Sequence, residues 1–236
     1  MAVVAADRPR LSIVIPALDE AACLGDTLSC LQAMRARGHE VILVDGGSQD
    51  ATVHLAGQAV DRVIHSRRGR ARQMNAGAHD ASGDILWFLH ADTRAPDNAD
   101  QLIVEALTSD AHCWGRFDVE LADRSLLLRG VARLMNLRSR LTGIATGDQG
   151  MFMTRAAFAR IGGFEDMPLM EDIAASRALR RISPPAALRT TLPTSTRRWR
   201  RHGIVKTIVA MWGLRLAYFL GVPTQRLARY YSPHSR

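Results

Sequence analysis

Residues 83–92 read GDILWFLHAD, and this stretch decides the fold class of the chain. Its apolar run, residues 85 to 89, predicts a strand covered on both faces, which is typical of central strands in parallel sheets. Open α/β sheets bind their ligands at the carboxyl ends of such strands. His90 and Asp92 lie at that end, two positions apart, so an extended backbone would point both side chains the same way. We therefore expect this strand end to face a diphosphate and a cation.

Length and composition fit a single globular domain. At 236 residues, of which 47% are hydrophobic, the chain matches one large α/β domain without a disordered linker. Its three cysteines, Cys23, Cys30 and Cys113, show no CxxC spacing, which argues against a zinc site or a disulfide framework. The first residues lack the charged and apolar regions of a signal peptide, so we expect a cytoplasmic location.

Positive charge is concentrated in the last quarter of the chain. The net charge is +8, and no Asp or Glu follows Asp172, whereas thirteen basic residues do. Such a segment is expected to face an anionic partner, namely phosphate groups, nucleic acid or a lipid surface. Within it, Lys206 and Arg215 interrupt the apolar segment 203–222 and argue against a membrane-spanning helix.

Eight apolar residues of segment 203–222 recur at helical spacing and predict one apolar helix face. They are Ile204, Val205, Ile208, Val209, Trp212, Leu216, Phe219 and Leu220. We expect this helix to pack on the sheet. The alternatives are a helix that lies in a membrane interface and a helix that pairs with a second subunit.

Strands and helices alternate on both sides of the central strand. Strands are predicted at 11–16, 40–44, 62–65, 114–121 and shortly after 150, and helices at 20–37, up to about 59, 96–107, 125–139 and 155–161. A strand, a crossover helix and a second strand form a βαβ unit with parallel strands. The pattern therefore predicts an α/β fold around a mostly parallel sheet.

Two polar stretches flank the strands of the first half. Asp45 ends the second strand and opens DGGSQD (45–50), whose glycines let the backbone approach a ligand. Neither GxGxxG nor GxxxxGK[ST] is present, which argues against dinucleotide binding and P-loop chemistry. Residues 67–72 contain four arginines, which can clamp a diphosphate. The alternative, a solvated basic loop, is disfavoured by its place just before the central strand.

Two acidic stretches mark the second half. The turn TGDQG (146–150) contains Asp148 and Gln149 and leads into an apolar strand. Glu171 and Asp172 open a predicted helix. Carboxylates stabilise a helix amino terminus, so a purely structural role is the alternative to a catalytic one.

The order of the motifs is more specific than any one of them. The series is IPALDE (15–20), VDGGSQD (44–50), RGRARQMNAGA (68–78), GDILWFLHADT (83–93), GDQGMFM (147–153), GGFED (162–166), PLMED (168–172) and TRRW (196–199). This series resembles the family 2 glycosyltransferases of GT-A fold, and looks closest to the compact bacterial subgroup associated with arsenosugar biosynthesis. The resemblance implies one domain over 1–236, with a nucleotide-sugar-binding half at about 10–95 and an acceptor half with a basic helical segment at about 96–236.

The resemblance also implies a donor site for a nucleotide-diphospho-sugar, most readily a UDP-sugar. Its residues would be Pro16, Ala17, Leu18 and Glu20 around the base, Asp45 at uracil or ribose, Arg68 and Arg70 at the nucleotide, and His90 and Asp92 in the DxD position. Asp92 would bind a divalent metal, Mn or Mg. His90 replaces the first Asp of that motif, and a neutral imidazole adds no negative charge for a hard cation.

The implied reaction transfers the sugar to an unidentified hydroxyl of a small molecule or lipid, with inversion. Asp172, in the position of the family's ED motif beside Glu171, would be the general base, and Asp148 is the competing candidate. Gln149, Arg198 and Trp199 would lie on the acceptor or diphosphate side. The processive QxxRW motif is not matched, because Ser195 stands where its Gln would be. We therefore expect non-processive transfer, with segment 203–222 as a candidate contact to the inner membrane face or a second subunit.

Two rival functions follow from the same residues. A sugar-phosphate nucleotidyltransferase shares the α/β layout, but would carry a glycine-rich basic loop after the first strand, where this chain has ALDE (17–20). A non-catalytic protein that binds nucleic acid or membrane would use the basic last quarter. No known nucleic-acid-binding module is recognised in the sequence, so no nucleic acid is expected as a partner.

Overall fold

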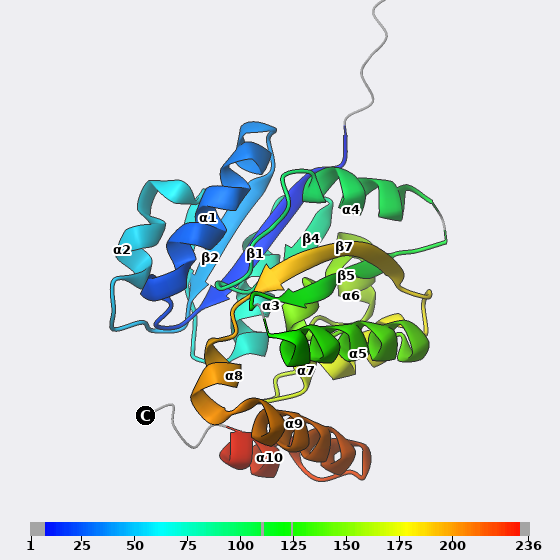
Figure 1. Cartoon of the computed structure of the whole chain (residues 1–236). Coiled ribbons are helices and arrows are strands. Elements are labelled where there is room, and N and C mark those ends of the chain that lie inside the picture. Colours follow the sequence, from blue (N-terminus) through cyan, green and yellow to red (C-terminus); the bar gives the residue numbers. More distant parts are fainter. Residues whose placement is uncertain (1–7, 110, 124, 232–236) are drawn as a thin grey trace, which may run out of the picture.

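A seven-stranded sheet forms the centre of the computed structural model, which describes residues 8–109, 111–123 and 125–231 (Figure 1). The strands are β1 (Leu11–Ala17), β2 (Glu40–Asp45), β3 (Arg62–His65), β4 (Ile85–Phe88), β5 (Trp114–Leu121), β6 (Phe152–Thr154) and β7 (Ala186–Thr194). Their order is β3-β2-β1-β4-β6-β5-β7, and β6 runs antiparallel to β4 and β5. The predicted α/β class with a mostly parallel sheet is therefore confirmed.

Helices cover both faces of this sheet (Figure 1). They are α1 (Ala21–Ala36), α2 (Thr52–Ala56), α3 (Arg70–Asp80), α4 (Ala99–Thr108), α5 (Leu126–Thr142), α6 (Arg155–Arg160), α7 (Glu171–Leu179), α8 (Arg197–His202), α9 (Ile204–Phe219) and α10 (Thr224–Tyr231). Short 3-10 turns span Gly57–Ala59 and Gly147–Gln149. Successive strand residues serve opposite layers. Ile13 and Trp87 belong to the core under α1 and α4, whereas Val14 and Leu86 belong to the core under α3 and α6.

All four residues of β4 are buried, as predicted for a central strand. Helix α3 packs closely on its neighbours through Gly77, where an added Cβ would lie 2.4 Å from a methyl group of Val14 and 2.8 Å from one of Val44. This close packing fixes the helix that begins at Arg70. Of the four arginines within residues 67–72, Arg70 and Arg72 lie on the first turn of this helix.

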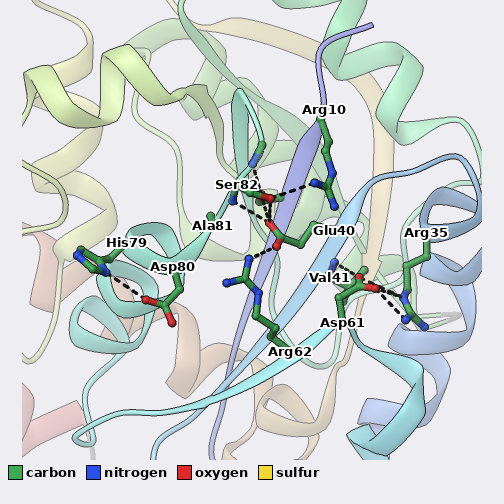
Figure 2. A network of polar contacts seen from close by, with 12 residues as sticks. Arg10, Arg35, Glu40, Val41, Asp61, Arg62, His79, Asp80, Ala81 and Ser82 are labelled. Carbon is green, nitrogen blue, oxygen red and sulfur yellow. Dashed lines mark hydrogen bonds and ion pairs between the residues drawn. The ribbon is translucent and has the colours of Figure 1, made fainter. Parts of the chain in front are cut away.

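A polar network joins the strands at their amino-terminal ends, opposite the edge where the candidate site is expected. The buried Glu40 carboxylate accepts hydrogen bonds from the Ser12 hydroxyl at 2.6 Å and from the backbone N–H of Ser82 at 2.9 Å, and it pairs with the Arg62 guanidinium. Figure 2 shows Glu40 between Arg62 and Ser82. One carboxylate thus ties β1, β2, β3 and the loop before β4 together.

The sequence pattern did not predict β7, α8 or α10. Strand β7 pairs in parallel with β5, with a register shift between Arg116 and Asp118. Its residues alternate irregularly between buried and part-exposed positions, so they lack the period-2 pattern that marks a strand.

Helix α9 departs from the prediction for segment 203–222. Ile204, Ile208 and Met211 pack on a cluster formed by β5, α5 and Trp199. The expected single packed face is wrong, because the remaining apolar residues turn outward and are 58 to 75% exposed. They are Val205, Val209, Trp212, Leu216, Phe219 and Leu220. Within the described residues, no helix has the length and apolar character needed to cross a bilayer.

Candidate active site

A cleft of about 370 Å³ opens beyond the carboxyl ends of β1 and β4. It is bounded by the α7 amino terminus, the loop around Gly147, the β7–α8 connection and α9. Many of the predicted site residues line it: Pro16, Glu20, Arg70, His90, Asp92, Asp148, Glu171, Asp172 and Trp199. Residues separated by up to 183 positions in the sequence therefore share one cavity at the expected sheet edge.

Asp92 lies in the turn after β4, and its backbone carbonyl accepts a hydrogen bond from Ser195 N–H at 3.2 Å. Its carboxylate makes no hydrogen bond or ion pair with another described residue. Burial raises the pKa of Asp92, and the nearby Glu20 raises it further, while Arg197 and Arg70 oppose the shift. Glu20 itself pairs with Arg197 at 2.7 Å. A cation beside Asp92 would stabilise this otherwise unpaired carboxylate.

The residues present fit a metal that enters together with its substrate. No three His, Cys, Asp or Glu side chains in the described part of the chain are placed to bind one ion, so this part forms no all-protein metal site. Mg²⁺ commonly takes one or two carboxylates and completes its shell with phosphate oxygens and water. Asp92 can supply the carboxylate, and a diphosphate in the cleft can supply the remaining oxygens.

His90 lies against the Gly147 turn. Its Nε2 is buried without a hydrogen-bond partner among the described residues, and a Cβ at Gly147 would lie 2.5 Å from that atom. Burial, together with the Arg70 cation, holds the pKa of His90 well below its ordinary value. The imidazole is therefore neutral, so His90 can take part in a hydrogen bond but adds no charge for a metal.

Two carboxylates compete for the role of general base. The Asp172 carboxylate accepts backbone hydrogen bonds from Gly147 at 2.8 Å and Ile173 at 2.7 Å, which hold it at the cleft. Burial raises the pKa of Asp148, whose hydrogen bond to Thr146 opposes that shift, while the Asp172 charge adds to it. The ionised form of Asp148 is therefore less favoured here than it is in water. A base must be ionised to accept a proton, so the arrangement favours Asp172.

Glu171 and Arg70 both line the cleft and form an ion pair, with 4.0 Å between the guanidinium and the carboxylate. Burial and the adjacent Asp172 raise the pKa of Glu171. Met170, which precedes Glu171 and Asp172, has a φ angle of 73°, in the left-handed region that costs free energy for a residue other than glycine. The acidic pair therefore enters the cleft from a constrained turn.

Other predicted residues lie outside the cleft lining, and their binding roles stay predictions. They are Ala17, Leu18, Asp45, Arg68 and Gln149. The Asp45 carboxylate accepts hydrogen bonds from the N–H groups of Gly47 and Ser48 and so stabilises its own turn. Gln149 is fully buried, and its side chain accepts the Thr146 N–H at 3.1 Å. Arg198 is the second residue of α8, and its side chain lies outside the described part of the structure.

The structure adds cleft residues that sequence reasoning missed. They are mainly Thr146, Thr194, Ser195, Arg197, Met211, Leu214, Arg215 and Tyr231. The one available signal was Arg215, a charge within an otherwise apolar helix. The others depend on how β7 and the three last helices fold back over the sheet edge.

Comparisons with known proteins agree with this architecture. The profile of Glycosyl transferase family 2 matches residues 12–162. An undecaprenyl-phosphate 4-deoxy-4-formamido-L-arabinose transferase of Pseudomonas aeruginosa is 31% identical over 157 residues, 61% of this chain and 45% of that protein. A Mycobacterium tuberculosis protein described as an uncharacterized glycosyltransferase is 33% identical over 168 residues, 66% of this chain and 63% of that protein. The matches thus span only about half to two thirds of these relatives.

Solved structures share the fold at low sequence identity. S. aureus TarS 1–349 in complex with UDP superposes with a TM-score of 0.66 and 15% identity, covering 79% of this chain and 60% of that one. Glucosyl-3-phosphoglycerate synthase from Mycobacterium tuberculosis, in complex with Mn²⁺, UDP and phosphoglyceric acid, gives a TM-score of 0.64 and 18% identity, covering 91% and 80%.

Proposed function

Because the chain belongs to glycosyltransferase family 2, we propose that it transfers a sugar from a nucleotide-diphospho-sugar to an acceptor hydroxyl, with inversion and one sugar at a time. The observation that carries this proposal is one cleft that holds an unpaired Asp92 carboxylate and the backbone-anchored Asp172 carboxylate. A UDP-sugar is the proposed donor, supported by the similar folds solved with UDP-GlcNAc and with Mn²⁺ and UDP. The arsenosugar-associated subgroup remains part of the proposal and rests on the motif series.

The proposed transfer uses the two ends of the cleft differently. Asp172 removes the proton of the acceptor hydroxyl while that oxygen forms a bond to the anomeric carbon. The bond from the anomeric carbon to the diphosphate oxygen breaks on the opposite face, and the nucleoside diphosphate leaves with the electron pair. Arg70 stabilises the negative charge that grows on the leaving group. Asp92 would hold the divalent metal, which supplies further positive charge to the diphosphate when bound.

Glu171 and Asp148 support this chemistry from either side. Glu171 pairs with Arg70 and so positions its guanidinium. Asp148 remains the alternative base, and its carboxyl group lines the same cleft. His90 would contribute a neutral hydrogen bond to ribose or phosphate.

We further propose that the exposed face of α9 lies on an anionic bilayer. This face presents Trp212 and Phe219, residues that favour the membrane interface. Exposed cations lie on α8, α9 and α10, namely Arg201, Lys206 and Arg226, and no acidic residue follows Asp172 to repel anionic lipid. Sedimentation with phosphatidylglycerol vesicles, but not phosphatidylcholine vesicles, would support this contact. A concentration-dependent dimer that leaves vesicles unbound would instead assign the face to a second copy.

Calorimetry with UDP tests the donor proposal. Wild-type protein should bind UDP at least tenfold more tightly with Mn²⁺ than without it, and Asp92→Asn should remove that difference. Asp26→Asn is the matched control, because Asp26 is exposed on α1 and does not line the cleft. Equal UDP affinity with and without Mn²⁺ in the wild type would refute the metal assignment. Release of pyrophosphate from UTP and a sugar phosphate would favour the rival nucleotidyltransferase activity.

A further inference from the structure

Exposed hydrophobic residues gather on two neighbouring helices. Within the described residues, the exposed large hydrophobic side chains lie on α5 or in 204–220, except Leu55 and Tyr230. Those of α5 are five leucines with exposed fractions between 52 and 80%, namely Leu126, Leu127, Leu134, Leu137 and Leu141. Single exposed leucines are ordinary, but a group of them on one helix marks an interaction surface. The α9 residues belong to the bilayer contact proposed above, whereas that contact does not include the leucines of α5.

The five leucines form one stripe along α5, called the leucine stripe below. At about 100° per residue, they fall within an arc of roughly 100° around the helix axis. The buried residues of α5 lie on roughly the opposite side and pack on β5; they include Leu128, Val131, Ala132 and Met135. This packing holds α5 against the sheet and leaves the leucine stripe facing outward.

Arginines border the leucine stripe. Every charged residue of α5 is an arginine, and Arg129 and Arg133 are exposed and form no ion pair with a described residue. Arg140 lies along the same edge of the stripe and pairs with the Asp118 carboxylate at 2.6 Å. An apolar stripe with a cationic edge fits an anionic lipid surface, because the leucines can enter the headgroup region while the guanidinium groups meet the lipid phosphates.

The same charges disfavour a second copy of the chain as the partner of this stripe. In a symmetric dimer, a surface patch meets the identical patch of the other copy. Two leucine stripes in contact would bring the arginines of both α5 helices together, and α5 contains no Asp or Glu to pair with them. Like charges placed against each other destabilise such an interface. A bilayer that contains anionic lipid has the complementary charge instead.

Helix α9 lies next to α5 and extends the surface. Ile204, Ile208 and Met211 of α9 pack on the cluster that contains the buried face of α5. Figure 1 shows both helices in the lower half of the molecule, with α4 in the upper half. The outer side of α9 carries the exposed Trp212 and Phe219, and its inner side lines the cleft.

We propose that the leucine stripe of α5 lies on an anionic bilayer together with the exposed face of α9. Two helices on one lipid surface hold the chain in a fixed orientation, whereas α9 alone would leave it free to roll about the helix axis. The contact is peripheral, because the opposite face of α5 is buried against β5. In this orientation α9 separates the lipid surface from the cleft. The inference extends the proposed α9 contact and does not depend on the transferase activity.

Co-sedimentation with phosphatidylglycerol vesicles tests the α5 contact. The triple variant Leu134→Gln/Leu137→Gln/Leu141→Gln should bind these vesicles at least tenfold more weakly than the wild type, because three apolar side chains no longer enter the headgroup region. Leu55→Gln is the control, since Leu55 is an exposed leucine on α2, and it should stay within twofold of the wild type. Vesicle binding that is unchanged in the triple variant, or absent in the wild type, would overturn the inference.

A second pair of variants tests the choice of anionic lipid. Arg129→Gln/Arg133→Gln should bind phosphatidylglycerol vesicles at least tenfold more weakly than the wild type, because two cations near an anionic surface are lost. Arg160→Gln, which removes an exposed cation of α6, should stay within twofold of the wild type. Equal binding of the double arginine variant and the wild type would overturn the assignment of the stripe to anionic lipid.

Sedimentation equilibrium without lipid separates the bilayer from a second copy. The wild type should be monomeric, and a wild-type dimer that the triple leucine variant abolishes would assign the stripe to a second copy and overturn the inference. Trp212→Gln/Phe219→Gln tests α9 separately. If that variant loses vesicle binding and the triple leucine variant does not, the α5 contact is rejected and the α9 contact stands.

The melting temperature excludes a structural role for the leucines. Substitutions of exposed side chains usually change stability little, so the triple leucine variant should melt within a few degrees of the wild type. A fall as large as that of Leu128→Ala, which empties a buried position of the same helix, would assign the leucines to the fold and overturn the inference. UDP affinity is measured alongside; a wild type that fails to bind UDP rejects the donor proposal and leaves the vesicle result standing.

Discussion

Glu40→Gln tests whether the carboxylate network at the amino-terminal ends of the strands stabilises the sheet. Glu40 is 3% exposed and accepts hydrogen bonds from Ser12 and Ser82 in addition to its pairing with Arg62 (Figure 2). Burial alone would raise its pKa, but these bonds outweigh burial and lower the pKa from 4.5 to about 2. The folded state therefore stabilises the ionised form of the Glu40 carboxyl group.

The difference between the ordinary pKa of 4.5 and the folded-state pKa of about 2 gives the stability that the ionised Glu40 contributes. A shift of roughly 2.5 pKa units, at about 1.36 kcal/mol per unit, corresponds to about 3.4 kcal/mol at pH 7. Because the folded pKa is depressed, this stability is present above the unfolded pKa and is lost as pH falls toward the folded pKa. The same linkage leaves about 1.4 kcal/mol at pH 3. Glu40→Gln should thus destabilise the protein by about 3 kcal/mol at pH 7 and by roughly 1 kcal/mol at pH 3.

Urea unfolding at pH values from 3 to 7 measures this difference. Glu105→Gln is the control, because Glu105 is exposed on α4 and should change the free energy of unfolding little at any pH. UDP affinity of Glu40→Gln at pH 7 should match the wild type, since the network lies at the opposite edge of the sheet from the cleft. A difference between wild type and variant that is below 1 kcal/mol at pH 7, or that does not shrink toward pH 3, would refute the reasoning.

Three further predictions concern the cleft. Asp172→Asn should bind UDP like the wild type but transfer sugar at least a hundredfold more slowly, measured as UDP release from a UDP-sugar. If Asp172→Asn still turns over and Asp148→Asn does not, the base is Asp148. Gly147→Ala should place a methyl group against the His90 ring and weaken UDP binding in calorimetry, whereas a fully active variant would show that the turn shifts freely. Burial and a hydrogen bond to the Glu20 carboxylate raise the pKa of Cys23 to about 12. At pH 8 the Cys23 thiol should therefore react with iodoacetamide at least tenfold more slowly in the native than in the denatured protein, as followed by peptide mass spectrometry. Similar rates in the two states would contradict this prediction.

The sequence by itself determined the elements whose information is local. The apolar run before His90 identified a central strand, and its four residues are buried in the structure. Alternation of strands and helices predicted the parallel half of the sheet, since a right-handed βαβ crossover leaves few arrangements. The sequence also predicted that His90, Asp92 and Asp172 lie at one edge of the sheet. In such a fold the parallel strands end, and the helices that follow them begin, at the same edge.

The sequence could not place the last quarter of the chain. Strand β7 lacks a regular pattern because it lies at the sheet edge, where burial alternates weakly. Helix α9 carries apolar residues around most of its circumference, so its pattern cannot say which side packs on α5 and which remains exposed. Those choices depend on contacts between segments far apart in the sequence.

Only the tertiary structure decided which charges are partnered. Folding pairs Arg116 with Asp118 and Arg140 with the same carboxylate, yet Nε and Nη2 of Arg116 and of Arg138 stay buried without a hydrogen-bond partner among the described residues. Asp45 closes its own turn, whereas Asp92 reaches the cleft unpaired. A residue type fixes which bonds a side chain can make. The number of those bonds that remain open for a ligand depends on the distances that packing sets between distant segments.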